Sequence, residues 1–152
     1  MKILIATDGA RQSEAAIEML KRFRLEPTDQ IKIVSVVDMA VPMAVDIYGG
    51  YMPNTAEIEQ SARENAERIL SDAASAIRKH YDTTELHIIT EVLFGSPESR
   101  IVEAARDFKA DLVVVGSHGY STWERLLLGS VSDAVVHHVP CSVLVVRICE
   151  DA

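Results

Sequence analysis

The sequence predicts an α/β fold built on one five-stranded, mostly parallel sheet, and two observations lead to this prediction. Short apolar runs alternate along the chain with longer segments in which apolar residues recur at helical spacing. Most of the short runs are almost continuously apolar, which is typical of strands covered by helices on both faces. The predicted strands are Lys2 to Ala6, Ile31 to Val37, Leu86 to Leu93, Asp111 to Val115 and Ser142 to Arg147.

Four helices are predicted between these strands. Ser13 is the predicted cap of the first helix, and Thr55 is the predicted start of the longest one. Ser96-Pro97 fits an N-cap followed by proline at the first helical position. The last helix is predicted to begin near Ser130 and to stop before Pro140, because proline cannot continue a helix.

Length and composition fit a soluble protein with one domain over residues 1–152. Hydrophobic residues make up 48% and charged residues 25%, and the net charge of -8 argues against a nucleic-acid binder, which usually shows a basic stripe. No membrane-spanning run or secretory leader is evident, so no membrane partner is expected. Cys141 and Cys149 flank an extended run and lie too far apart for an intrachain disulfide, which favours the cytoplasm.

One irregular segment interrupts the pattern, from Met39 to Asn54. A loop of this length is uncommon inside a compact domain and is often functional. The sequence leaves open whether the segment is a lid, a partner contact or simply a loop.

The most informative motif is Gly116-Ser117-His118-Gly119, followed after nine residues by Gly129-Ser130. Glycine permits tight bends and close approach of a ligand to the main chain. Ser130 is expected at a helix N-terminus, where unpaired N–H groups and the helix dipole favour an anion. Asp8 ends the first strand, and ligands of open α/β sheets bind where the carboxyl ends of the strands meet. The pattern predicts nucleotide binding more than chemistry on the nucleotide.

These residues resemble the universal stress protein family in its ATP-binding branch, whose motif is G-x2-G-x9-G-[S/T]. The resemblance covers essentially the whole chain, from the first strand and Asp8 through Gly95-Ser96-Pro97 to Val139-Pro140 and the last strand. It implies a Rossmann-like fold, similar to the adenine nucleotide alpha hydrolases, with five strands in the order 3-2-1-4-5. It also implies a homodimer and ATP in the crevice.

The resemblance further implies a set of nucleotide-binding residues. Asp8 corresponds to the family's aspartate after the first strand, and Val36 to a backbone contact near the adenine. The positions that would touch ribose and phosphates are Gly116, Gly119, Gly129, Ser130 and Val131. Ala10 is a departure, because the family often has serine there.

Structural explanations of the same residues stay open at this point. Asp8 alternatively caps the first helix or holds its turn, and Gly129-Ser130 alternatively forms only a loop and a helix cap. A carboxylate repels a triphosphate unless a cation intervenes or the carboxylate faces the adenine or ribose instead, so the sequence leaves open whether Mg²⁺ or Mn²⁺ accompanies ATP. No metal site made by the protein itself is predicted.

The functional prediction is an ATP-binding regulator or sensor in a stress response. The sequence has no G-x4-G-K-[S/T] loop, no G-x-G-x-x-G fingerprint and no nucleophile–His–Asp set, so no catalytic residue is predicted. The first alternative is a slow ATPase or AMP-forming enzyme, and the second is a nucleotide-free dimeric interaction module. The dimer is expected to form through the last strand, Val143 to Val146, because an exposed apolar edge needs a partner.

Overall fold

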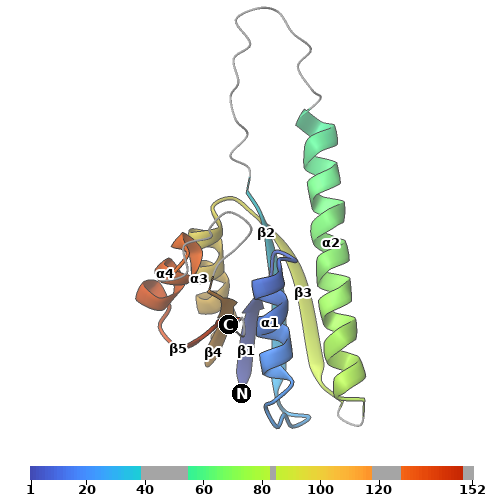
Figure 1. Ribbon diagram of the computed structural model, residues 1–152, viewed down its shortest axis with the longest axis vertical. Helices are drawn as coiled ribbons and strands as arrows, with labels where there is room; N and C mark the ends of the chain where they lie inside the picture. The colour runs from blue at the N-terminus through green and yellow to red at the C-terminus, as the bar shows by residue number, and fades with distance from the viewer. Residues whose placement is uncertain (39–54, 83–84, 118–127, 149–152) are drawn as a thin grey trace, which may run out of the picture.

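The computed structural model describes residues 1–38, 55–82, 85–117 and 128–148. Strands and helices alternate strictly along these residues (Figure 1). In chain order they are β1 (Lys2–Ala6), α1 (Arg11–Leu20), β2 (Gln30–Val37), α2 (Thr55–His80), β3 (His87–Phe94), α3 (Pro97–Phe108), β4 (Leu112–Gly116), α4 (Ser130–His138) and β5 (Ser142–Val146).

The strands form one parallel sheet in the order β3-β2-β1-β4-β5, which confirms the predicted fold class and strand order. β1 lies at the centre and pairs with β2 on one side and β4 on the other. The chain therefore winds outward in one direction from β1 to β3 and in the opposite direction from β4 to β5. This change of direction creates a switch point between the carboxyl ends of β1 and β4, where ligands of such sheets bind.

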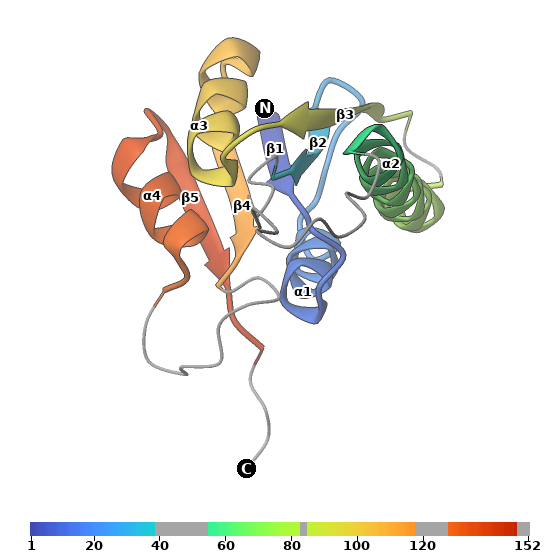
Figure 2. The same cartoon turned by 90° about the horizontal axis from the view of Figure 1, so that it is seen from above.

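Helices cover both faces of the sheet, as predicted (Figure 2). Successive side chains of a strand point to opposite faces, so β1 contributes to two cores. Ile3 and Ile5 pack with residues of α1 and α2, whereas Leu4 packs with residues of α3 and α4 on the other face. All three side chains are fully buried.

The predicted element boundaries are close to the observed ones, with one instructive difference at α1. The helix begins at Arg11 with Ala10 at the N-cap, so Ser13 lies inside the first turn and is not the cap. The Asp8 carboxylate accepts a hydrogen bond from the Ala10 N–H, which closes the turn before the helix starts. Ser13 is buried and bonds back to that turn.

The helix α2 extends past the sheet at its N-terminal end (Figure 1). Its residues 56–61 are exposed, and its buried stripe begins only at Ala66 and continues through Leu70 and Ile77. None of the described helices is long and apolar enough to cross a membrane.

Candidate functional site

The candidate site surrounds the carboxyl ends of β1 and β4. Ile5 of β1 pairs with Val114 of β4, so the ends of these strands lie next to each other. One residue past the end of each strand, the Thr7 N–H donates to Val34 O of β2, and the Ser117 N–H donates to Val146 O of β5. The two chain segments thus leave the sheet bonded to their outer neighbours, which separates them at the switch point.

The turn between β1 and α1 is held by a network of polar side chains. Asp8 Oδ1 lies 2.9 Å from the Ala10 N and 2.8 Å from the Ser13 Oγ. The Thr7 hydroxyl accepts a hydrogen bond from the Gly9 N–H and lies 3.1 Å from the Ser13 Oγ. These bonds give Asp8 a structural role through Oδ1, while Oδ2 has no partner among the described residues.

At two positions on this edge, backbone conformation or packing explains the glycine without any ligand. Gly9 has φ +75°, a conformation that glycine adopts freely. A Cβ on Gly116 would lie 2.7 Å from the carbonyl C and O of Gln12 and 3.0 Å from the N of Ser13. Gly116 is therefore needed for the close contact between β4 and the first turn of α1, whether or not a ligand is bound.

The two ends of the glycine motif are joined by hydrogen bonds. The Ser117 carbonyl accepts from the Gly129 N–H at 2.9 Å and from the Ser132 hydroxyl at 3.0 Å. Ser117 and Ser132 are both buried. We call Ser117, Gly129 and Ser132 together the Ser117 clasp. Ser132 was not among the predicted site residues, and its only sequence signal was its place two residues after Gly129-Ser130.

The N-terminus of α4 presents unpaired backbone donors. Gly129 is the N-cap, and the first bond of the helix runs from the Asp133 N–H to the Gly129 carbonyl. The N–H groups of Ser130, Val131 and Ser132, here called the α4 amides, have no partner among the described residues, as expected for the first turn of a helix. Since the Gly129 N–H is used in the clasp, the N–H groups of Ser130 and Val131 remain as candidates for the predicted phosphate contact.

A carboxylate that the sequence analysis missed lies at the start of the neighbouring helix α3. Glu98, in the first turn of α3, accepts a 2.6 Å hydrogen bond from the Ser96 hydroxyl. This bond, a backbone hydrogen bond and a bond from the Ser130 hydroxyl hold the pKa of Glu98 below its usual value. An acidic residue in a first helical turn is an ordinary pattern, so nothing in the sequence marks Glu98 for a special role.

Val36 lies at the same edge of the sheet. Ala6, the last residue of β1, pairs with Val34, so β2 continues past the end of β1 at Val36. Val36 is half-buried and pairs with Leu93. Of the predicted nucleotide-binding residues, the described part of the chain thus brings six to this edge: Asp8, Val36, Gly116, Gly129, Ser130 and Val131. Gly119 and the segment from Met39 to Asn54 lie outside the described residues.

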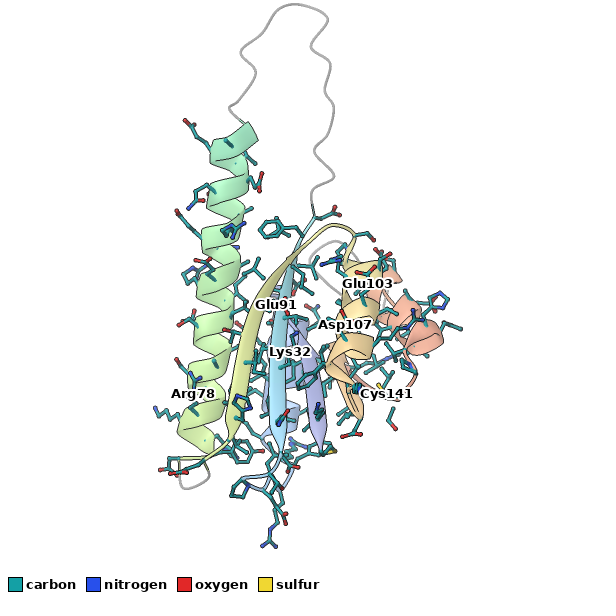
Figure 3. The ribbon with its side chains drawn as sticks, turned by 180° about the vertical axis from the view of Figure 1, so that it is seen from behind. Lys32, Arg78, Glu91, Glu103, Asp107 and Cys141 are labelled. Atoms are coloured by element: carbon teal, nitrogen blue, oxygen red, sulfur yellow. The ribbon has the colours of Figure 1, made fainter. Side chains whose placement is uncertain are left out.

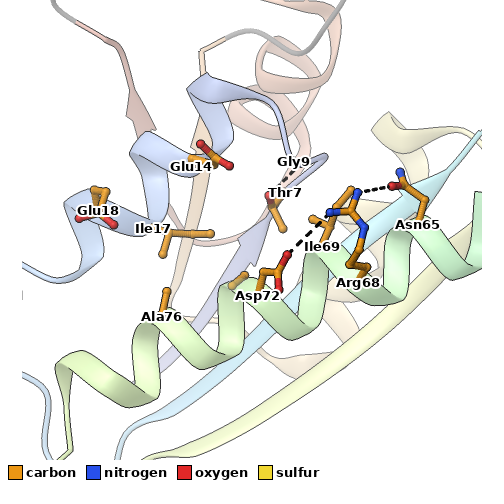
Figure 4. A pocket seen from close by; sticks show the side chains of 11 residues that line it. Thr7, Gly9, Glu14, Ile17, Glu18, Asn65, Arg68, Ile69, Asp72 and Ala76 are labelled. Carbon is orange, nitrogen blue, oxygen red and sulfur yellow. Dashed lines mark hydrogen bonds and ion pairs between the residues drawn. The ribbon is translucent and has the colours of Figure 1, made fainter.

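A cavity of 380 Å³ lies between α1 and α2 (Figure 4). Thr7 and Gly9 connect its lining to the turn after β1, and Ile17 and Ile69 provide apolar walls. At its rim, Arg68 donates to Asn65 Oδ1 at 2.7 Å and lies 3.9 Å from Asp72. The cavity is on the α1 and α2 face of the sheet, so it approaches Asp8 from the side opposite to α4.

Comparison with known proteins identifies the family. The model of the universal stress protein family matches residues 1–147. The chain belongs to the universal stress protein family. A Staphylococcus epidermidis protein named as a universal stress protein is 34% identical over 150 residues, which cover 95% of this chain and 82% of the relative.

Two solved structures of the family share the fold. A universal stress protein in complex with cAMP is 26% identical, with a TM-score of 0.63 and coverage of 97% of this chain and 96% of that chain. A family protein from Arabidopsis thaliana with AMP bound is 16% identical, with a TM-score of 0.67 and coverage of 99% and 94%. The second likeness concerns the fold alone.

Proposed function

We propose that this universal stress protein binds an adenine nucleotide at the switch point and acts as a nucleotide-dependent regulator or sensor in a stress response. The observation that carries the proposal is the set of α4 amides, which have no partner in the described part of the chain and are held beside the end of β4 by the Ser117 clasp. Such N–H groups at a helix N-terminus suit a phosphate. The family structure in complex with cAMP supports an adenine nucleotide as the ligand class.

In this proposal the glycine motif and the start of α4 bind the phosphates, and the ends of β1 and β2 bind the ribose and adenine. The N–H groups of Ser130 and Val131 would hold phosphate oxygens, and Gly119 would extend this contact along the motif. Asp8, through Oδ2, and the backbone of Val36 would face the ribose and adenine. ATP, accompanied by Mg²⁺ or Mn²⁺, is the specific ligand proposed from the glycine motif. We propose no catalytic residue, and at most slow ATP hydrolysis.

The protein is further proposed to be a cytoplasmic homodimer that pairs through Val143 to Val146. β5 is an outer strand of the sheet and bonds to β4 on one side only. Three of its residues, Val143 to Val145, are only half-buried in the single chain. A second copy of β5 would cover them. Leu144→Lys places a charge in this edge and is expected to give monomers by light scattering; a dimer of unchanged mass in a folded variant would refute this interface.

The proposed nucleotide site is tested by a matched pair of substitutions at Ser130. Ser130→Pro removes both the N–H and the hydroxyl, whereas Ser130→Ala removes the hydroxyl alone. Proline is tolerated at the first helical position, as Pro97 shows in α3, and the extended N-cap Gly129 is compatible with a following proline. Titration calorimetry with AMP, cAMP and ATP should show a further loss of affinity of about tenfold for Ser130→Pro compared with Ser130→Ala.

Two results would contradict the proposal. Equal affinities of the two variants would mean that the Ser130 N–H does not hold the phosphate. A wild-type protein that releases no nucleotide on denaturation, and whose melting temperature does not rise with millimolar nucleotide, would favour the nucleotide-free module, because a ligand that binds only the folded state must stabilise it.

A further inference from the structure

The outer edge of β3 carries main-chain groups without a strand partner. β3 pairs with β2 on one side, and no other described strand lies beside it (Figure 1). The Gly95 N–H donates to the Val37 carbonyl of β2, and the backbone groups of successive strand residues point alternately to opposite sides. Every second residue of β3 therefore turns its N–H and C=O groups outward, where the described residues offer no partner. These residues are Ile88, Thr90, Val92 and Phe94, here called the β3 edge.

The β3 edge lacks the usual protection against pairing. Natural proteins block exposed edges with lysine, proline, bulges or very short strands. β3 is eight residues long, contains neither lysine nor proline, and pairs with β2 in one unbroken register over its whole length. Its one acidic residue, Glu91, is held by Lys32 of β2 at 2.5 Å (Figure 3). The edge is therefore open to an added strand, which would gain main-chain hydrogen bonds along β3.

A groove of 520 Å³ lies between β3 and α2. Thr90 and Val92 line it from the strand, and the buried residues Leu70 and Ala74 line it from the helix. Side chains of adjacent strands on one face of a sheet lie next to each other. A strand added at the β3 edge would therefore place every second side chain in this groove.

The charges of the groove favour an acidic occupant. Arg63 and Arg78 are the first and last residues of α2 that line it, and neither has an acidic partner among the described residues. Arg63 lies over the Phe94 ring at 4.6 Å, a contact that supplies no counter-ion. Of the two acids in the lining, Glu91 is already paired and Glu67 remains. The groove thus presents two arginines against one glutamate, on a chain whose net charge is -8.

We propose that the β3 edge and this groove bind an extended acidic segment of a partner protein, which adds a strand to the sheet beside β3. Fifteen residues separate Arg63 from Arg78, a rise of about 22 Å along α2. An extended chain covers this distance in roughly seven residues, close to the length of β3. Carboxylates on one face of a strand are an even number of residues apart, so a spacing of about six suits the two arginines.

A second copy of this chain fits the β3 edge less well. Antiparallel pairing of two β3 strands would bring Arg63 and Arg78 of one α2 toward the same residues of the other, and like charges repel. An acidic segment brings the opposite charge. The proposed surface does not depend on the nucleotide site, so either proposal can fail without the other.

The test measures binding of a fluorescent synthetic peptide by anisotropy. The peptide has valine and threonine between two aspartates at this spacing, and a matched peptide has lysines in their place. Thr90→Pro removes an outward N–H of the exposed Thr90 and keeps the hydrogen bonds to β2. Arg78→Glu reverses a charge of the groove. Lys79→Glu is the control, because Lys79 is exposed on α2 and does not line the groove.

The aspartate peptide should bind wild type saturably and slow amide hydrogen exchange along the β3 edge. Thr90→Pro should abolish binding. Arg78→Glu should weaken binding about fivefold and Lys79→Glu less than about twofold. Should Thr90→Pro fail to fold, the two charge variants decide.

Three results would overturn the proposal. The first is equal binding of the aspartate and lysine peptides, or no binding of either. The second is an equal effect of Arg78→Glu and Lys79→Glu. The third is a wild-type dimer, seen by light scattering, that dissociates with folded Thr90→Pro, because the β3 edge would then belong to a second copy.

Discussion

The turn after β1 and the N-terminus of α4 flank the same switch point, yet they treat their polar groups in opposite ways. In the turn, the side chains of Thr7, Asp8 and Ser13 bond to one another and to nearby backbone. At α4, the backbone N–H groups of the first turn have no partner within the described part of the chain. The polar side chains of the turn thus bond within the turn, whereas the α4 amides lack an acceptor among the described residues.

This difference suggests that the turn after β1 keeps the site rigid and that the N-terminus of α4 binds the ligand. Buried polar groups that are fully bonded hold a loop in one conformation. Unpaired donors at an exposed helix end have no such structural benefit and are ready for a ligand. We therefore expect substitutions in the turn mainly to lower stability, and substitutions at α4 mainly to lower nucleotide affinity.

The largest expected effect on stability comes from Gly116. Because a Cβ would lie 2.7 Å from the backbone of Gln12, Gly116→Ala must push α1 away from β4. We expect a loss of about 3 kcal/mol in the free energy of unfolding, measured by urea denaturation. Gly129→Ala is the matched control: Gly129 has φ -64° and ψ 158°, which any residue adopts, and the expected cost at an N-cap is about 1 kcal/mol. Equal losses would show that α1 adjusts freely.

Ser13→Ala should have the next largest effect. Its hydroxyl lies within hydrogen-bond distance of Asp8 Oδ1, the Ala10 carbonyl and the Thr7 hydroxyl, and the residue is buried. We expect a loss of about 2 kcal/mol in the free energy of unfolding. Ser75→Ala, on the exposed face of α2, should cost nothing, because alanine is the better helix former.

The same variant sharpens the comparison between the two regions. If the turn serves only as a scaffold, Ser13→Ala lowers stability while the affinity for AMP stays within about twofold of wild type. A loss of affinity as large as that of Ser130→Pro would show that the position of Asp8 matters directly to the ligand. Both quantities are measured on the same preparations, by denaturation and by calorimetry.

Sequence reasoning predicted the sheet because each strand is short and apolar and each helix has its own periodic stripe. It placed Asp8 and the glycine motif at one edge, since carboxyl ends of parallel strands meet there, and the family resemblance added Val36. It missed Ser132, whose role depends on its contact with Ser117 across the glycine motif. It also misplaced the start of α1, because the Asp8 turn and not Ser13 ends the preceding loop.

The reading of Gly116 shows a further limit. A glycine in a motif is explained equally well by ligand approach and by close packing of the backbone, since both require the absence of a Cβ. The sequence contains no sign that α1 approaches β4 at this residue. Only the distances to Gln12 and Ser13 reveal the packing reason.

The smallest expected effect concerns the pH dependence contributed by Glu98. Its pKa is lowered in the folded protein, chiefly by the hydrogen bond from Ser96, so its bonds stabilise the fold at pH values above the unfolded pKa of about 4.3. This contribution is lost as the pH falls through the folded pKa. Wild type should thus exceed Glu98→Gln in unfolding free energy by less than about 1 kcal/mol at pH 7, and the difference should vanish near pH 3. A difference that persisted at low pH would mean that the glutamine disturbs the packing around α3, and that the effect at pH 7 is not due to the charge.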